Sequence, residues 1–185
     1  MIKKIENLIP KTYADDIEQL LDGEDFQYFW NSTISATGES IDDRVKNNPG
    51  YTHNVFDFER QSQNSWTYPI LKPILYFFEQ KENMILDKVL RIRVRRTNPW
   101  PGHTLEHYNP PHIDLDTAEP YWSLVYYADD SDGDTFIFDN DGKVIERVKP
   151  VKGNALLFPG KVYHSGNNPV NYNKRTIVNF DFTVK

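Results

Sequence analysis

The pattern of apolar and polar residues divides the chain into a first part with helical periodicity and a longer part with strand periodicity. In residues 13–21 the apolar positions recur at helical spacing, and Gly23 ends the pattern, which predicts a short amphipathic helix. Residues 70–79 predict a second helix, which begins or bends at Pro73 because proline removes a backbone hydrogen bond. We therefore expect helices that pack against the outside of a sheet formed by later residues.

Short strands separated by turns are predicted from residue 90 onward. Residues 90–95 alternate between apolar side chains and arginine, as in a strand with one buried face. Further short apolar runs follow, each bounded by Gly, Pro, Asn or Asp: residues 123–127, 135–138, 144–148, 155–158 and 176–182. This spacing predicts a mostly β fold with N-terminal helices, of the β-sandwich or jelly-roll type.

The length of the chain predicts a single domain. Its 185 residues are enough to bury a sizeable core. We expect residues 1–88 to form a helical and mixed buttress, and residues 89–185 to form the jelly-roll core. Polar residues, Gly and Pro dominate residues 31–49, which we interpret as a long loop and a candidate lid.

Composition excludes several classes of function. The sequence contains no cysteine, so disulfide scaffolds, thiol catalysis, Cys-ligated zinc and iron–sulfur clusters are excluded. The formal net charge of -6 predicts neither nucleic acid nor an anionic membrane as a partner. No run of 18 apolar residues and no signal-peptide pattern is present, so we expect a cytoplasmic protein. The oligomeric state is left open.

A candidate metal site begins with His112 and Asp114. Side chains two residues apart on an extended segment point the same way, so this pair can occupy adjacent corners of one metal site. The best candidate for a third ligand is His164, which follows a predicted strand and a Pro-Gly turn. Two imidazoles and one carboxylate with open positions are the ligand set of non-haem Fe(II) oxygenases.

A second histidine motif competes with this site. His103, Glu106 and His107 match the H-x-x-E-H pattern of inverted zinc metallopeptidases. That motif requires a helix, because only there do residues four apart reach one zinc ion. Prolines on both sides of the motif favour extended geometry. We therefore expect His103 and His107 to be solvent-facing loop residues or substrate contacts.

The arginines of residues 90–95 share one face of their predicted strand. Arg91, Arg93 and Arg95 lie at every second position. Two interpretations are open: a solvated or salt-bridged face, or a basic wall that attracts an anionic substrate or cosubstrate. Arg175 is a separate candidate for binding a carboxylate, because a guanidinium group can donate two parallel hydrogen bonds to it.

From about residue 90 to the C-terminus the sequence resembles the Fe(II)- and 2-oxoglutarate-dependent oxygenases, in particular their prolyl-4-hydroxylase-like branch. The resemblance rests on the order and spacing of several segments: His112-Ile113-Asp114, residues 124–127, Asp132-Gly133-Asp134-Thr135, residues 149–158, His164 and Arg175. Asp134 is a departure, because many members carry Gly-Gly-x-Thr here. This departure directly precedes Thr135 and so bears on the role of that residue.

The resemblance implies a double-stranded β-helix with a metal at its mouth. His112, Asp114 and His164 would hold Fe(II), and 2-oxoglutarate would chelate the metal through its 1-carboxylate and 2-oxo groups. O2 is the other cosubstrate, and ascorbate is a candidate reductant. Arg175 would pair with the 5-carboxylate of 2-oxoglutarate. The remaining cosubstrate contacts implied are Tyr127, Thr135 and Asn179.

The implied activity is hydroxylation of an unactivated C–H bond, with release of succinate and CO2. The substrate is a peptide or a small molecule, with a prolyl residue as the leading expectation and a small amino-acid-like molecule beside it. We expect the substrate contacts to include Trp100, Tyr108 and Trp122. Two alternatives remain at this point: a jelly-roll module that binds metal or sugar without redox turnover, and the zinc peptidase.

Overall fold

The computed structural model describes residues 1–33, 49–59 and 65–185. Most of residues 31–49, the candidate lid, lies outside the described residues. The elements in chain order are β1 (Lys3–Ile5), α1 (Lys11–Asp22), β2 (Phe29–Asn31), β3 (Gly50–Asp57), α2 (Tyr68–Leu71), α3 (Pro73–Glu82), β4 (Leu86–Thr97), β5 (Trp122–Tyr127), β6 (Thr135–Phe138), β7 (Val144–Val148), β8 (Ala155–Pro159), β9 (His164–Gly166) and β10 (Arg175–Val184).

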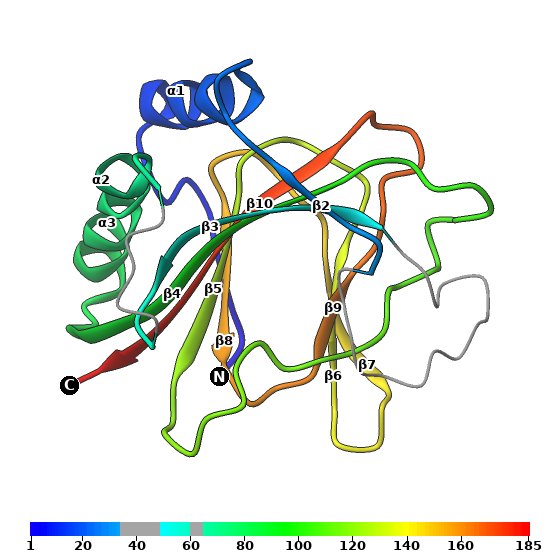
Figure 1. Ribbon diagram of the computed structural model, residues 1–185. Helices are drawn as coiled ribbons and strands as arrows, with labels where there is room; N and C mark the ends of the chain where they lie inside the picture. Colours follow the sequence, from blue (N-terminus) through cyan, green and yellow to red (C-terminus); the bar gives the residue numbers. More distant parts are fainter. Residues whose placement is uncertain (34–48, 60–64) are drawn as a thin grey trace.

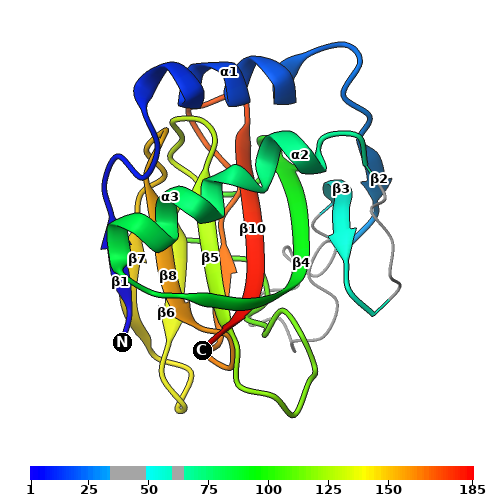
Figure 2. The same cartoon turned by 90° about the vertical axis from the view of Figure 1, so that its left-hand side faces the viewer.

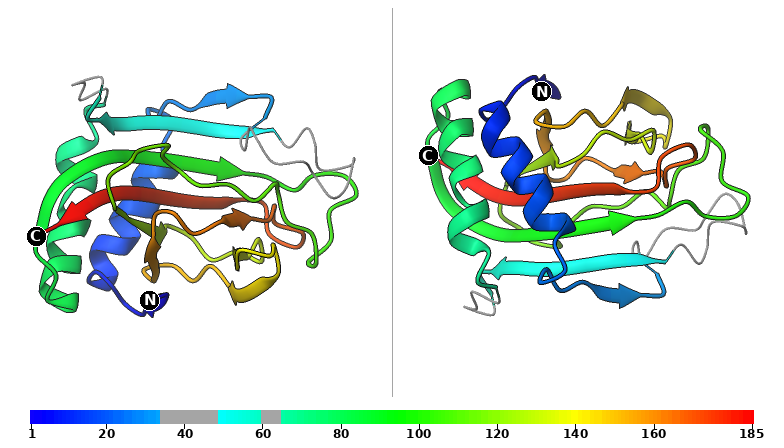
Figure 3. Two further views of the ribbon diagram at one scale, coloured as in Figure 1. Left: turned by 90° about the horizontal axis from the view of Figure 1, so that it is seen from below. Right: turned by 90° about the horizontal axis from the view of Figure 1, so that it is seen from above.

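Two antiparallel sheets form the body of the protein. The larger sheet has seven strands in the order β1-β8-β5-β10-β4-β3-β2, and the smaller has three in the order β7-β6-β9. The three helices lie on one side of the long strands β4 and β10, and the smaller sheet lies on the other side (Figures 1 and 3). This arrangement confirms the predicted jelly roll with helices outside it.

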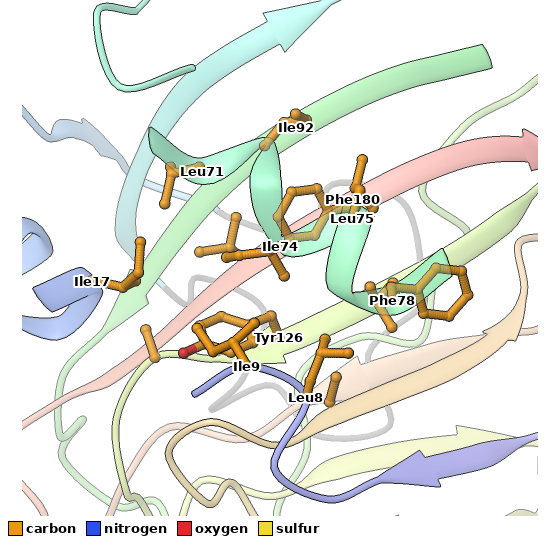
Figure 4. Packing of buried hydrophobic residues seen from close by; sticks show 14 of the residues in the cluster. Leu8, Ile9, Ile17, Leu71, Ile74, Leu75, Phe78, Ile92, Tyr126 and Phe180 are labelled. Carbon is orange, nitrogen blue, oxygen red and sulfur yellow. The ribbon is translucent and has the colours of Figure 1, made fainter. Parts of the chain in front are cut away.

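The helices cover one face of the larger sheet. Figure 2 shows α1 and α3 in front of its central strands. Alternate residues of β10, among them Phe180, pack with Leu75 and Phe78 of α3 and with Ile17 of α1 in one apolar cluster (Figure 4). At about 25 cal/mol per Å² of apolar surface buried, this cluster is a main source of stability.

The predicted helix boundaries agree with their sequence signals. Helix α1 ends next to Gly23, whose N–H donates to the carbonyl of Leu20. Pro73 separates α2 from α3 and begins the second of these helices, where its missing N–H costs no hydrogen bond. None of the helices in the described ranges has the length and apolar content that a membrane crossing requires.

The opposite face of the larger sheet is directed at the smaller sheet. A second, smaller apolar cluster lies between them and contains Val125, Leu156 and Ile177. Toward β3, polar side chains replace apolar ones on this face, because Asn179 and Asp181 of β10 lie beside Arg93 and Arg91 of β4. The interior of the jelly roll is therefore apolar on one side and polar on the other.

Candidate metal centre

The structure brings His112, Asp114 and His164 together. Their ligand atoms all lie within 4.8 Å of one another, and no other such group occurs in the described part of the chain. His112 forms an isolated antiparallel bridge with His164 of β9, and their backbones exchange hydrogen bonds of 2.9 and 3.0 Å. The backbone pairing thus fixes the two imidazoles side by side, with ring centroids 4.7 Å apart.

Each imidazole is oriented by its own backbone. His112 Nδ1 lies 3.1 Å from the carbonyl oxygen of Pro110, and His164 Nδ1 lies 3.2 Å from that of Val162. A carbonyl can only accept, so Nδ1 carries the proton and Nε2 keeps its lone pair, which is the tautomer that binds metal. His164 Nε2 lies 3.1 Å from Asp114 Oδ2. The donor atoms thus converge on one point.

Burial and charge hold His112 and Asp114 in the protonation states that a metal requires. Burial, with His164 and Arg95 as neighbours, lowers the pKa of His112 to about 3, so the imidazole is neutral at pH 7. Burial alone would raise the pKa of Asp114, but His164, Arg95 and Arg91 together lower it well below its usual range. Two imidazoles and a carboxylate suit Fe(II), so these residues fit the metal that the resemblance implies.

A buried ion-pair network fixes the side chain of Asp114. Arg91 donates to Asp114 Oδ1 over 2.9 Å and pairs with Asp181 over 2.8 Å. Ser123 donates to the other Asp181 oxygen over 2.7 Å. Burial, followed by the charge of Asp114, raises the pKa of Asp181 to about 6. This network fixes the carboxylate of Asp114 relative to the sheet.

Asn179 completes the surroundings of Asp114. Its side-chain Nδ2 donates to Asp114 Oδ2 over 3.0 Å. Asn179 lies four residues after Arg175 on β10 and therefore shares its face of the strand, and both residues line the same pocket as the metal cluster. The structure thus places Asn179 against a candidate metal ligand.

A pocket of about 550 Å³, including its open mouth, extends from the cluster to Arg175. Arg175 donates to Thr135 Oγ1 over 2.8 Å, and Tyr127 donates to the same oxygen over 3.0 Å. Thr135 Oγ1 thus accepts twice and keeps its own O–H to donate toward a ligand. Tyr127 does not line the pocket itself, because its hydroxyl ends at Thr135.

Two glycines make room for the Arg175 side chain. A Cβ at Gly133 would lie 2.8 Å from Arg175 Cδ and 2.6 Å from the carbonyl oxygen of Asn167. A Cβ at Gly166 would lie 3.0 Å from the guanidinium group. Asp134 is not among the described residues that line the pocket, and it pairs with Arg147 over 2.6 Å. The unusual aspartate thus leaves Thr135 free to face the pocket.

The predicted substrate contacts are placed differently from the metal cluster. Trp122 packs against the helix-side core, because even-numbered positions of β5 face the helices, so the structure contradicts its expected position at the pocket. The ring of Tyr108 lies 4.9 Å from that of Phe138, on the smaller sheet. Trp100 lies in the loop after β4 and is partly exposed. Neither residue lines the described pocket.

The H-x-x-E-H segment is not a helix. Glu106 pairs with Arg147 over 3.1 Å, and His103 Nδ1 lies 3.0 Å from Asn167 Oδ1. His103 is buried, so the expectation that it faces solvent is wrong, and its side chain helps to fix the loop instead. Without a helix, the zinc-peptidase interpretation loses its geometric basis.

The arginines of β4 lie in different surroundings, and the salt-bridged interpretation holds for Arg91. Arg91 belongs to the buried ion-pair network, and Arg95 lines the pocket. Two members of this network, Asp181 and Ser123, were missed from the sequence. Asp181 lies two residues after Asn179, so strand parity alone was a signal for its position.

Comparison with solved structures identifies the architecture. An oxidoreductase of the 2OG-Fe(II) oxygenase family from Burkholderia pseudomallei aligns with a TM-score of 0.70 and 12% identity, over 98% of this chain and 84% of that one. A Pseudomonas putida prolyl-4-hydroxylase aligns with a TM-score of 0.58 and 14% identity, over 100% and 92% of the two chains. The protein has the 2-oxoglutarate oxygenase fold.

A third structure with the oxygenase fold contains a bound peptide. It is a prolyl hydroxylase from Trichoplax adhaerens in complex with a fragment of the hypoxia-inducible factor oxygen degradation domain. It aligns with a TM-score of 0.63 and 14% identity, over 98% of this chain and 83% of that one. No protein-family model and no curated protein matches the sequence. At these identities the comparisons establish the oxygenase fold, and the chemistry rests on the site.

Proposed function

We propose that this protein is an Fe(II)- and 2-oxoglutarate-dependent dioxygenase that hydroxylates an unactivated C–H bond. The proposal rests on one observation: a single pocket has candidate metal ligands at one end and candidate carboxylate-binding groups at the other. One end offers His112, Asp114 and His164, with donor atoms converging within 4.8 Å. The other end offers Arg175 and Thr135, which are arranged for a carboxylate.

The residues of this chain would hold the reactants in a fixed order. His112, Asp114 and His164 would bind Fe(II), which supplies oxidative decarboxylation of 2-oxoglutarate and hydroxylation when it is bound. Arg175 and the Thr135 hydroxyl would bind the 5-carboxylate of 2-oxoglutarate by charge-assisted hydrogen bonds. The 1-carboxylate and 2-oxo groups would then face the three metal ligands.

Three features of the chain would prepare the pocket for this role. Arg91 and Asn179 hold the Asp114 carboxylate on both of its oxygens, so its orientation is set before a metal arrives. Val125 and Ile177 line the pocket between its two ends and exclude water from its floor. Tyr127 positions the Thr135 hydroxyl through one hydrogen bond.

The substrate proposed from the sequence is a prolyl residue of a peptide or a small amino-acid-like molecule. The peptide-bound prolyl hydroxylase supports the first, since it shows that the same fold accommodates a peptide. Fold alone does not select a substrate. A choice between the two therefore needs a feature of the pocket itself.

The test is cosubstrate turnover. The protein is incubated with Fe(II), 2-oxoglutarate and ascorbate under air, and succinate is measured over time. We expect succinate to form slowly without substrate, and His112→Ala to abolish it. Absence of succinate from the wild-type protein, or equal formation by His112→Ala, would overturn the proposal.

A further inference from the structure

A second arginine lies in the pocket and has no role in the proposed cosubstrate site. Arg95 of β4 lies opposite Ile177 in the register of the two strands, while Arg175 lies opposite Thr97. Both arginines line the pocket. The guanidinium group of Arg175 is held by Gly133 and Thr135, whereas that of Arg95 reaches toward the metal cluster.

The present contacts of Arg95 are long and incomplete. Its Nη1 lies 3.4 Å from His112 Nε2, and its Nη2 lies 3.6 Å from Asp114 Oδ1. Its Nε is buried and has no hydrogen-bond partner among the described residues. A metal on His112 takes the Nε2 lone pair, so Arg95 then loses one of these contacts. Buried donors are almost always paired in folded proteins, which indicates that a ligand supplies the missing acceptor.

Other residues that line the same pocket also have buried polar atoms without a partner in the described part of the chain. They are Thr97 Oγ1, Asn109 Oδ1 and Asn179 Oδ1. A pocket that collects such atoms is shaped for a polar ligand, because a buried polar atom that stays unpaired destabilises the protein. Among these atoms of the pocket, Arg95 Nε is the one that belongs to a charged group.

The charges of the pocket specify the sign of that ligand. Among its described lining residues, Arg95 and Arg175 are cationic, and Asp114 is the one carboxylate. Fe(II) and the 2-oxoglutarate dianion add no net charge. One positive charge thus remains uncompensated, and it lies at Arg95 because Arg175 is matched by the 5-carboxylate. Arg93, two residues earlier, lies instead in a neighbouring hollow bordered by Asp57 and Glu119.

We propose that Arg95 binds a carboxylate of the substrate, so that the substrate is a small carboxylate-bearing molecule such as a free amino acid rather than a residue inside a peptide. The proposal rests on the proposed function, because it assigns both carboxylates of 2-oxoglutarate to other positions. A guanidinium group donates two parallel hydrogen bonds to a carboxylate, so Arg95 would both neutralise and orient this substrate.

The test measures ligand binding rather than turnover. The protein is loaded with Zn(II) and 2-oxoglutarate, and the affinities of acetate and N-acetylglycine are compared with those of their uncharged amides by ligand-observed NMR. We expect a carboxylate preference of about tenfold or more in the wild-type protein, equivalent to about 1.4 kcal/mol. Arg95→Gln should lose the preference, and Arg95→Lys should retain part of it because the charge remains.

Controls separate this inference from the alternatives. Arg93→Gln removes an arginine from the same strand face but outside the pocket, and it should keep the preference. Carboxylates that bind the metal directly would bind Arg95→Gln as well as wild type. No carboxylate preference in the wild-type protein would overturn the proposal.

A second measurement on the same variants excludes a cosubstrate role. The affinity for 2-oxoglutarate should change less than about threefold in Arg95→Gln. A loss comparable to that of Arg175→Gln would assign Arg95 to the cosubstrate and overturn the proposal, while leaving the oxygenase function intact. If 2-oxoglutarate does not bind the metal-loaded wild type, the proposed function itself fails.

Discussion

The two faces of strand β10 show how one segment serves both the fold and the site. Val178, Phe180 and Phe182 point toward the helices and are fully buried among apolar side chains. The residues between them, Asn179 and Asp181, point into the jelly roll and form hydrogen bonds around Asp114 and Arg91. One face stabilises the fold by burying apolar surface. The other face positions polar groups around the candidate metal ligand.

Substitutions at neighbouring positions of β10 should therefore have different effects. A substitution on the helix side removes packing and lowers the free energy of unfolding. A substitution on the pocket side removes a ligand contact from a sheet that the other face still holds together.

The largest effect on ligand binding is expected at the metal. His164→Ala removes one of three ligands and should lower Fe(II) affinity at least roughly 100-fold, since loss of an outer partner alone typically costs about 10–100-fold. Anaerobic calorimetry measures the affinity. His103→Ala is the matched control, because His103 is also buried but belongs to the loop motif. The reverse outcome, with loss only in His103→Ala, would return the metal to the H-x-x-E-H segment.

On the helix side, Phe180→Ala should destabilise the protein by about 3–5 kcal/mol, because it leaves a cavity beneath α3. Urea unfolding measures this loss. The neighbouring Asn179→Ala should cost only about 1 kcal/mol, near the typical net value of a hydrogen bond. Equal destabilisation by the two variants would show that the faces do not divide the work as described.

At the far end of the pocket, Arg175→Gln should weaken 2-oxoglutarate binding about 100-fold, or about 2.7 kcal/mol, the scale for losing one partner of a buried charged pair. Binding to the Zn(II)-loaded protein is measured by calorimetry. Arg96→Gln is a suitable control, because Arg96 lies on β4 facing the helix side and binds Asp22. Unchanged affinity in Arg175→Gln would show that Arg175 does not bind the 5-carboxylate of 2-oxoglutarate.

A smaller effect than these losses of packing and binding is expected in the pH dependence of stability. His112 has a pKa of about 3 in the folded protein, against 6.5 for an ordinary histidine. Below pH 6.5 the unfolded chain therefore binds a proton that the folded protein does not, and stability falls with pH. By pH 5 the loss from His112 is about 2 kcal/mol.

Urea unfolding of the metal-free protein at pH 7.5 and pH 5 checks this value. His112→Gln cannot take up the proton, so it should lose about 2 kcal/mol less than wild type between the two pH values. An identical loss in both proteins would mean that the imidazole is not held neutral by its surroundings.

Local patterns predicted the elements with clear periodicity. The alternation of residues 90–95 located β4, and the turn residues bounded β6 and β7 at their observed limits. The strands β1, β2 and β9 were missed because three residues are too few to show a period, and their partners are distant in sequence. Lys3 pairs with Leu157, for example, and no local signal reports that contact.

The candidate site could be predicted where the spacing of residues in the sequence determines which way their side chains point. His112 and Asp114 are two residues apart, so their shared orientation followed from extended geometry. The Arg91–Asp181 pair joins two strands, and nothing in either segment identifies the other as its partner. The same limit applied to Trp122, since the choice of its face depends on which side the helices cover.

An anaerobic spectrum shows whether the pocket binds Fe(II) and 2-oxoglutarate together. Adding 2-oxoglutarate to the Fe(II)-loaded protein should produce a visible charge-transfer band, which His112→Ala abolishes and Arg175→Gln shifts to higher 2-oxoglutarate concentration. A protein that binds Fe(II) but shows no band at any 2-oxoglutarate concentration would contradict the account and leave a metal-binding jelly roll without this chemistry.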